Sequence, residues 1–557
     1  MIALFAVTDA GRRAAAEVAP ALDAQVHPLD ELQRLWPRLD AAVFFLATGA
    51  TVRLVAPLLA DKQTDPGVVC VDEARRFAVA VTGGHEGGAN ALAERVGALL
   101  GAQPVITTAS DATATTGIQD MAAALDAVVD GDAAAAGRAL LDGAAVVENP
   151  LAFPLPPTPV PRHPAVRPGH RIVVTDRLEA DVTRVVPRTL VLGIGSARGV
   201  AAAAVADTVR RIETEHGFDL RAVRAYASVD LKADEAGILA AIAPAELRTY
   251  PAQVLAGVAV PNPSEVVRAE VGTPSVAEAA ALHAAAELGG GAPVELVVEK
   301  VKGENVTVAA ARIRPRGRLA IIGLGPGAAD LRVPRAEAEL RRASVVVGLD
   351  QYVEQVRHLL RPGTEVRVSG LGDEEQRAAD AVALATKGRA VALIGSGDAG
   401  VYAMASPALQ QAGADIEVVG VPGVTASLAA AALLGAPLGH DHVLISLSDL
   451  HTPWPVIEKR IAAAAEADLV TCFYNPRSRD RHWQLGAALD AFRAYRPPST
   501  PVGAVRQASR AGQRVWAAPL AEFDPTEVDM LTTVVVGSSA TRMVAGRMVT
   551  PRGYRWS

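Results

Sequence analysis

A histidine–glutamate pair set between glycines is the first group of residues that could do chemistry. Residues 82–97 read TGGHEGGANALAERVG, so His85 and Glu86 have two glycines on either side. Histidine can take a proton from water near neutral pH, and a neighbouring carboxylate can orient its ring. The string therefore predicts an acid–base or carboxylate-binding site, and a turn with an exposed His and Glu stays open as the alternative.

Three glycine-rich turns follow apolar runs in the last part of the chain. They lie in residues 318–327 (RLAIIGLGPG), 391–404 (VALIGSGDAGVYAM) and 418–431 (VVGVPGVTASLAAA). Glycines let the backbone approach a ligand closely, and proline stiffens a turn. The broken GxGxxG spacing argues against a dinucleotide site. Asp398 could meet a cationic or hydroxyl-bearing part of a ligand or cap a helix, and Thr425 is a candidate helix start.

Composition limits the class of protein. The chain has 557 residues, half of them apolar and 21% charged, which predicts several soluble domains. A net charge of -7 without a basic block argues against nucleic acid as a main partner. Cys70 and Cys472 stand far apart, so we expect a reducing cytoplasm, no disulfide scaffold and no bound metal. Residues 418–439 carry no charge but contain prolines, which favours a buried helix over a membrane span.

The elements that must position these residues alternate between short apolar runs and alanine-rich helical stretches. This alternation predicts an α/β multidomain protein with parallel sheets. We expect domains at 1–118, 119–187, 188–314 and 316–557. The proline-rich stretch 149–168 excludes a regular helix and predicts a linker after a small middle domain. Ser275, with Glu278 three residues on, predicts a capping box at a helix start.

The last 240 or so residues resemble the tetrapyrrole methylase family. The resemblance is carried by the three glycine-rich turns and by four further strings, SLSDLHTPW (446–454), YNPRSRDR (474–481), DMLTTVVVG (529–537) and TPRGY (550–554). Within the family these strings are most similar to the precorrin-3B C(17)-methyltransferases. The resemblance implies two α/β domains that clamp S-adenosylmethionine (SAM) and a corrin precursor in a cleft. It also implies methyl transfer to carbon 17 with ring contraction.

The resemblance further assigns residues to roles. Proton handling falls to Asp449, His451 and Tyr474, and the carboxylates of the macrocycle to Arg477, Arg479 and Arg481, although a solvated arginine cluster is the alternative. The implied SAM contacts are Gly325, Pro326, Gly327, Gly395, Gly397, Asp398, Tyr402, Met404, Thr425, Ala426, Asn475 and Thr533. Family members commonly form homodimers, so we expect one through this half. Methylases of the same fold that act on uroporphyrinogen, diphthine or ribosomal RNA are a less favoured alternative.

The front half resembles the cobalt-precorrin-5A hydrolases. The matching strings are TGATVR (48–53), TTASDATATTG (107–117), YASVDLKADEAGIL (226–239) and VGTPSVAEAAAL (271–282), together with the His85–Glu86 loop. The resemblance implies opening of a δ-lactone on the corrin periphery with release of acetaldehyde. His85 would act as base, Glu86 would orient it, and Lys232 would bind substrate. A non-catalytic tetrapyrrole-binding module fused to the methyltransferase is the alternative.

Overall fold

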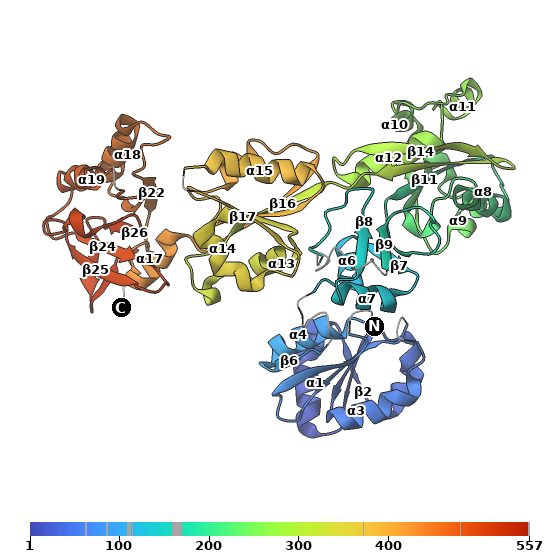
Figure 1. Ribbon diagram of the computed structural model, residues 1–557, viewed down its shortest axis with the longest axis horizontal. Coiled ribbons are helices and arrows are strands. Elements are labelled where there is room, and N and C mark those ends of the chain that lie inside the picture. Colours follow the sequence, from blue (N-terminus) through green and yellow to red (C-terminus); the bar gives the residue numbers. More distant parts are fainter. Residues whose placement is uncertain are drawn as a thin grey trace.

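The computed structural model describes residues 1–61, 64–84, 87–107, 113, 115–158, 170–370, 372–478 and 481–554. Its sheets are covered by helices, which confirms the predicted α/β multidomain class (Figure 1). The helices of the described residues include none long and apolar enough to cross a membrane.

The N-terminal sheet has six strands in the order β2-β1-β3-β4-β5-β6. Its elements are β1 (Ile2–Ala6), α1 (Asp9–Leu22), β2 (Gln25–His27), α2 (Leu32–Leu35), β3 (Ala41–Phe45), α3 (Thr48–Val55), β4 (Gly67–Val71), β5 (Phe77–Thr82), α4 (Ala89–Leu100) and β6 (Gln103–Val105). The expected parallel sheet is only partly correct, because β4 and β5 pair antiparallel. Only residues 72–76 join these two strands, and so short a connection cannot make a parallel crossover.

The middle sheet has the order β7-β10-β9-β8. Its elements are α6 (Ile118–Ala124), β7 (Ala127–Asp130), α7 (Ala133–Leu141), β8 (Ala145–Glu148), β9 (His170–Val174) and β10 (Thr183–Pro187). The proline-rich stretch lies between β8 and β9, which are parallel neighbours. Parallel neighbours need a crossover connection. The prolines therefore belong to a connection inside this sheet, which corrects the expectation of a linker after it.

The central sheet has the order β13-β12-β11-β15-β14. Its elements are β11 (Leu190–Ser196), α8 (Ala202–Thr214), β12 (Val223–Val229), α9 (Ala236–Ile242), β13 (Leu247–Tyr250), α10 (Ala252–Ala256), α11 (Glu265–Val271), α12 (Ala277–Gly289), β14 (Val294–Lys302) and β15 (Val306–Ile313).

The predicted capping box at Ser275 is wrong. Helix α12 begins after Val276, which makes no side-chain cap. The carboxylate of Glu278 instead accepts hydrogen bonds from the Ser275 hydroxyl (3.3 Å), the Asn262 amide (2.9 Å) and a backbone N–H of β14 (3.2 Å). Glu278 is fully buried, so its carboxylate needs these several donors, of which Ser275 contributes its hydroxyl.

The first C-terminal sheet is entirely parallel, with the order β18-β17-β19-β16-β20. Its elements are β16 (Gly317–Gly323), α13 (Pro334–Arg342), β17 (Val345–Leu349), α14 (Asp350–Val356), β18 (Glu365–Ser369), α15 (Glu374–Thr386), β19 (Ala390–Gly395), α16 (Ala405–Leu409), β20 (Ile416–Val421) and α17 (Ala426–Leu434). Both faces pack into apolar cores. Since β19, β16 and β20 are neighbours, their glycine-rich turns emerge together at the carboxyl edge.

The second C-terminal sheet has the order β22-β23-β26-β24-β25, with a small sheet β21-β28-β27 beside it. Its elements are β22 (His442–Ser446), α18 (Trp454–Glu466), β23 (Val470–Tyr474), α19 (Gln484–Arg493), β24 (Pro501–Arg506), β25 (Arg514–Pro519) and β26 (Thr532–Val536). The small sheet contains β21 (Gly435–Ala436), β27 (Arg542–Val544) and β28 (Arg547–Val549).

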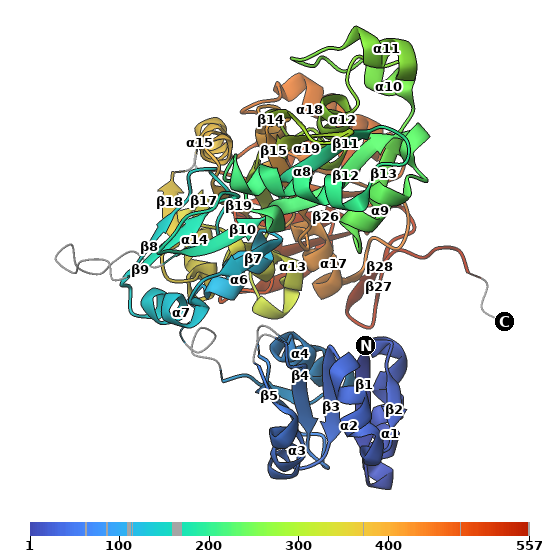
Figure 2. The same ribbon diagram turned by 90° about the vertical axis from the view of Figure 1, so that its right-hand side faces the viewer.

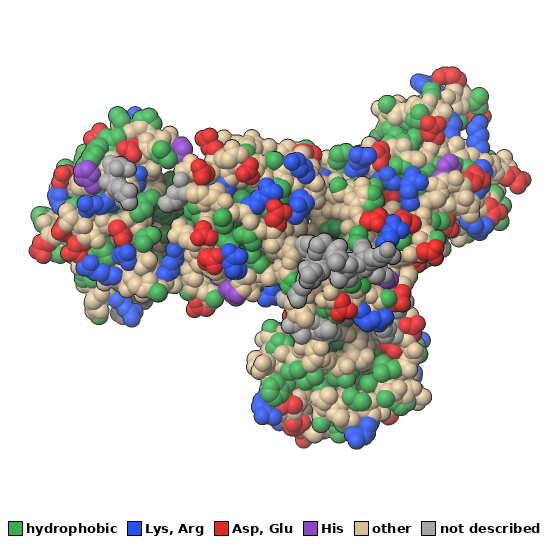
Figure 3. Space-filling model, in the orientation of Figure 1, with side chains coloured by type: hydrophobic (Ala, Val, Ile, Leu, Met, Phe, Trp, Pro, Cys, Tyr) green, Lys and Arg blue, Asp and Glu red, His purple; other side chains and the backbone are tan. Residues whose placement is uncertain are grey.

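The two C-terminal sheets lie side by side, and the middle sheet sits between the first of them, the central sheet and the N-terminal sheet (Figures 1 and 2). Acidic and basic side chains are interspersed over the face drawn in Figure 3, in keeping with the modest net charge of -7.

Candidate functional site

The three glycine-rich turns meet at the carboxyl edge of the first C-terminal sheet. Gly325 and Gly397 exchange two backbone hydrogen bonds, of 3.0 and 2.8 Å. A Cβ on Gly423 would stand 2.1 Å from the carbonyl oxygen of Gly397 and 2.7 Å from that of Gly323. The third turn therefore requires glycine because its backbone lies directly on the other two.

Gly395 differs from these glycines. It is buried, yet a Cβ built on it would meet no atom within 4 Å, and its φ is not in the left-handed region. The position that a side chain of residue 395 would occupy is therefore open space, although the loops around it are closely packed. Such a position lets a ligand approach the main chain.

Asp398 braces the loops. One carboxylate oxygen accepts from the N–H of Gly400 at 2.8 Å and the other from the N–H of Gly423 at 3.0 Å. It does not cap the next helix, because α16 begins at Ala405 after Met404. Of the two roles that the sequence left open, the helix cap is excluded.

Tyr474 joins the two C-terminal sheets. Its hydroxyl lies 2.6 Å from the Thr425 hydroxyl and accepts from the N–H of Ser427 at 2.9 Å. Thr425 precedes α17 as predicted but makes no cap of its own, so Tyr474 satisfies an N–H of the first turn in its place. Its ring lies 5.3 Å from that of Tyr402, whose hydroxyl donates to the carbonyl of Leu444 at 2.8 Å.

Three further predicted cofactor residues have other neighbours. Met404 is buried in the core of the first C-terminal sheet, with its sulfur 3.5 Å from a guanidinium nitrogen of Arg377. Asn475, with a φ of 50°, donates to the Ser446 hydroxyl at 3.1 Å. Thr533 is buried on β26.

The two arginines of the YNPRSRDR string that the structure describes donate hydrogen bonds to other parts of the protein. Arg481 is buried and donates to the Asn475 carbonyl at 2.9 Å and the Ser448 hydroxyl at 3.2 Å, and burial lowers the pKa of its guanidinium. Arg477 donates to the carbonyl of Thr526 at 3.1 Å. Arg479 lies outside the described residues.

Asp449 and His451 lie in the exposed loop between β22 and α18. The amide of Gln484, a buried residue that the sequence analysis missed, donates to the Asp449 carboxylate at 3.2 Å. Arg481 stands 3.9 Å from the same carboxylate. These two buried side chains fix Asp449 at the rim of the second C-terminal sheet.

Arg510 is a second residue that the sequence analysis missed. From the loop after β24 it donates to the Pro326 carbonyl and, at 2.8 Å, to the Ser396 hydroxyl. A Cβ on Gly327 would stand 2.5 Å from the Arg510 side chain. Arg510 thus ties the second C-terminal sheet to two of the glycine-rich turns, and no local pattern indicates this contact.

In the front half, His85 and Glu86 lie outside the described residues. The glycines around them pack on Gly67, where a Cβ would stand 2.1 Å from the Gly87 carbonyl oxygen. Because Thr82 pairs with Val68, this loop leaves the sheet at the amino end of β4. Helix α3, which contains the TGATVR string, follows β3 at the opposite edge, on the side of the domain away from the rest of the chain (Figure 2).

Lys232 lies at the carboxyl edge of the central sheet. Its ammonium is 3.3 Å from the Glu235 carboxylate, which also accepts from the N–H of Gly199 at 2.9 Å. This predicted substrate residue therefore shares a buried partner with the neighbouring glycine loop. Within the ranges that the structure describes, no cluster of three or more His, Cys, Asp or Glu side chains is placed to hold a metal ion.

Comparison with known families places the parts of the chain. Residues 30–111 match the N-terminal model of cobalamin synthesis protein G, residues 190–311 match its C-terminal model, and residues 318–524 match the tetrapyrrole (corrin/porphyrin) methylases.

Several known proteins are similar to about two fifths of this chain. A probable cobalt-factor III C(17)-methyltransferase of Salmonella typhimurium is 48% identical over 242 residues, which cover 42% of this chain and 99% of that protein. The cobalt-factor III methyltransferase of Priestia megaterium is 42% identical over 249 residues, which cover 43% of this chain and 46% of that protein. A crystal structure of the methyltransferase CobJ shares 38% identity over 42% of this chain and 100% of that one, with a TM-score of 0.40. The chain therefore belongs to the tetrapyrrole methylase family, and it carries N- and C-terminal regions of cobalamin synthesis protein G ahead of the methylase.

Proposed function

We propose that the chain is a bifunctional enzyme of cobalamin biosynthesis. Its C-terminal part would methylate precorrin-3B, or its cobalt-containing counterpart, at carbon 17 with ring contraction. Its front part would open the δ-lactone of cobalt-precorrin-5A and release acetaldehyde. The observation that carries the first activity is the 48% identity to a C(17)-methyltransferase over 99% of that protein.

The cofactor of the methyl transfer would be SAM, which supplies a methyl group on a positively charged sulfur. The open space at Gly395, close to positions such as Gly423 where a Cβ would collide with backbone, supports a ligand at the carboxyl edge of the first C-terminal sheet. Gly325, Gly327 and Gly397, which have no side chains, would let the ligand approach the main chain there, and Asp398 and Arg510 would hold the loops in place. Alignment in a dry site is the main requirement, since the ring carbon is already nucleophilic.

The macrocycle would lie toward the second C-terminal sheet. Asp449 and His451 are exposed there and can handle a proton, with Gln484 and Arg481 positioning Asp449. Arg477 and Arg481 already donate hydrogen bonds to main-chain carbonyls. We therefore propose that their main role is to hold the loops that contain those carbonyls, and that pairing with substrate carboxylates is secondary. We further propose that the protein works in the cytoplasm as a homodimer joined through this half.

Lactone opening would add water across the ester bond and needs a base and an oxyanion donor. The matches to both cobalamin synthesis protein G models support this activity for residues 1–314. The proposed base His85 and its partner Glu86 stand between β5 and α4 in the sequence, outside the described residues, and helix α4 lies on the side of the N-terminal domain that faces the rest of the chain (Figure 2).

One experiment tests both activities. The full chain is incubated with SAM and precorrin-3B or cobalt-factor III, and the macrocycle is analysed by mass spectrometry. In parallel, acetaldehyde is measured after incubation with cobalt-precorrin-5A. A gain of one methyl group and release of acetaldehyde are expected. Methylation without acetaldehyde would leave the front half as a tetrapyrrole-binding module, and the absence of methylation on either ring would refute the substrate assignment.

A further inference from the structure

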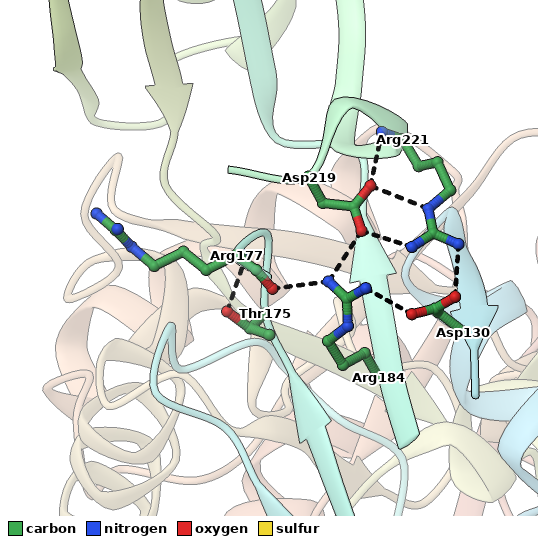
Figure 4. A network of polar contacts seen from close by, with 6 residues as sticks. All are labelled: Asp130, Thr175, Arg177, Arg184, Asp219 and Arg221. Carbon is green, nitrogen blue, oxygen red and sulfur yellow. Dashed lines mark hydrogen bonds and ion pairs between the residues drawn. The ribbon is translucent and has the colours of Figure 1, made fainter. Parts of the chain in front are cut away.

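A ring of alternating charges fixes the middle sheet to the central sheet (Figure 4). Arg184 on β10 binds Asp219 at 2.9 Å and also contacts Asp130 on β7. Arg221 binds Asp219 and Asp130, each at 2.7 Å. The side chains of Arg184 and Asp219 are 6% and 2% exposed, so this junction is part of the protein interior. A second buried pair, Arg312 and Asp176, joins the same two sheets at 2.6 Å.

The middle sheet also contacts the first C-terminal sheet through three separate segments. Arg342, the last residue of α13, donates to the carbonyl of Ala124 at 3.2 Å. Arg361 stands 3.5 Å from the Asp120 carboxylate. A Cβ on Gly388, whose φ is 79°, would lie 2.4 Å from the carbonyl oxygen of Ala152. These residues belong to helix α6 and to the ordered start of the proline-rich stretch on one side, and to the methylase on the other.

Each contact suits its surroundings. Ala124 ends α6, where carbonyl groups lack helical partners and a cation is favourable. Arg342 is half-buried at this junction, and burial lowers the pKa of its guanidinium. The turn at residues 149–153 is fixed by two hydrogen bonds between Asn149 and Phe153, of 2.8 and 3.0 Å. The surface that meets the methylase is therefore ordered from within.

The contacts share one edge of the first C-terminal sheet. Arg342 precedes β17, Arg361 precedes β18, and Gly388 precedes β19. All three thus lie at the amino ends of parallel strands, whereas the glycine-rich turns lie at the carboxyl ends. The methylase uses opposite edges of one sheet for its ligand loops and for this contact.

We propose that helix α6 and residues 149–153 form a docking surface for the amino edge of the methylase sheet. This surface, rather than the short covalent connection at residues 314–316, holds the two parts of the chain together. The partner that fits it is a methylase domain with arginines at the start of β17 and β18 and a glycine turn before β19. The proposal does not depend on which reactions the two parts catalyse.

The test uses the full chain with a protease recognition sequence inserted after Pro315. The folded protein is cut, and its mass is measured by light scattering during gel filtration at low-micromolar concentration. The two fragments are expected to elute together with the mass of the uncut protein or of its dimer. Separation of the cut wild-type fragments would overturn the proposal.

A variant of the surface provides the second arm. Gly388→Asn keeps a residue that tolerates positive φ but places its side chain against Ala152. Combined with Arg361→Glu, which opposes Asp120, it is expected to weaken association of the cut fragments at least tenfold. Gly372→Asn is the matched control, because Gly372 has a φ of 92° and a Cβ there meets nothing within 4 Å. Unchanged thermal unfolding of the methylase would show that the variants fold. Persistent association of the double variant would also refute the docking surface.

Discussion

Gly395→Ala separates ligand contact from loop packing in the proposed SAM site. The added methyl group would enter the open space beside Gly395 without touching protein. We therefore expect the free energy of unfolding to change by less than about 0.5 kcal/mol. If SAM lies against this backbone, the same methyl group should raise its Kd about tenfold, which corresponds to about 1.4 kcal/mol. Isothermal titration calorimetry with SAM and a thermal unfolding curve measure the two quantities on one preparation.

Two glycines, one on β20 and one in the turn after it, serve as controls. In Gly423→Ala the Cβ would stand 2.1 Å from a backbone oxygen, against an ordinary contact of 3.4–4 Å. Overpacking of this kind costs about 1–3 kcal/mol and should lower the Tm of the methylase by roughly 2–10 °C. Gly420→Ala on β20, where a Cβ meets nothing within 4 Å, should change neither quantity. Unaltered SAM affinity in Gly395→Ala would refute the placement of the cofactor.

Three other expectations follow from single side chains. Arg510→Ala removes the bonds to Pro326 and Ser396 and should weaken SAM binding about tenfold in calorimetry, with Arg510→Lys restoring only part, because lysine lacks the planar fork. Tyr474→Phe leaves the Ser427 N–H without its acceptor and should cost about 1–2 kcal/mol, visible as faster hydrogen exchange at the start of α17; unchanged exchange would exclude this cap. Arg184→Met should destabilise the junction of the middle and central sheets by about 3 kcal/mol in chemical unfolding, less than for a lone buried pair since Arg221 remains.

The junction around Arg184 also makes stability depend on pH. Hydrogen bonding to Arg221 holds the pKa of Asp130 below its usual range. Burial alone would raise the pKa of Asp219, but its hydrogen bonds with Arg221 outweigh that effect and the pKa is lowered. A carboxyl group with a lowered folded-state pKa stabilises fully above its unfolded pKa of about 3.9 and loses that contribution as the pH falls through the folded value. Wild type should therefore lose its advantage over Arg184→Met below about pH 4. An advantage that persists under more acidic conditions would contradict this account.

Strands and turns could be predicted from the sequence because their formation depends mainly on residues that are close together in the chain. Apolar runs such as 318–323 became buried strands, and the turns after them became loops whose glycines touch one another. The resemblance to tetrapyrrole methylases rested on the same local strings, and the family comparison confirmed it.

Contacts between distant segments could not be read in the same way. Nothing near Arg510 indicates that it lies on Gly327, and nothing near Gln484 indicates that it holds Asp449. The parallel pairing of β8 with β9 likewise joins two strands that lie on either side of the proline-rich stretch in the sequence. The stretch was expected to be a linker between domains, but it connects two strands of one sheet. Local preferences limit the conformation of a segment, whereas burial against remote segments decides its partners.

The arrangement of contacts on the methylase sheet bears on how a methylase can share one chain with a second multidomain part. A parallel sheet gathers its ligand loops at the carboxyl ends of the strands, so the amino edge can be covered without blocking them. In this protein Arg342, Arg361 and Gly388 meet the middle sheet at that amino edge, while Arg510 and Tyr474 connect the second C-terminal sheet to the carboxyl edge. Among these contacts, those of the front half are all at the amino edge, and the ligand loops at the carboxyl edge are left free. A front half attached at the amino edge therefore leaves the proposed SAM loops in contact with the methylase alone among these residues.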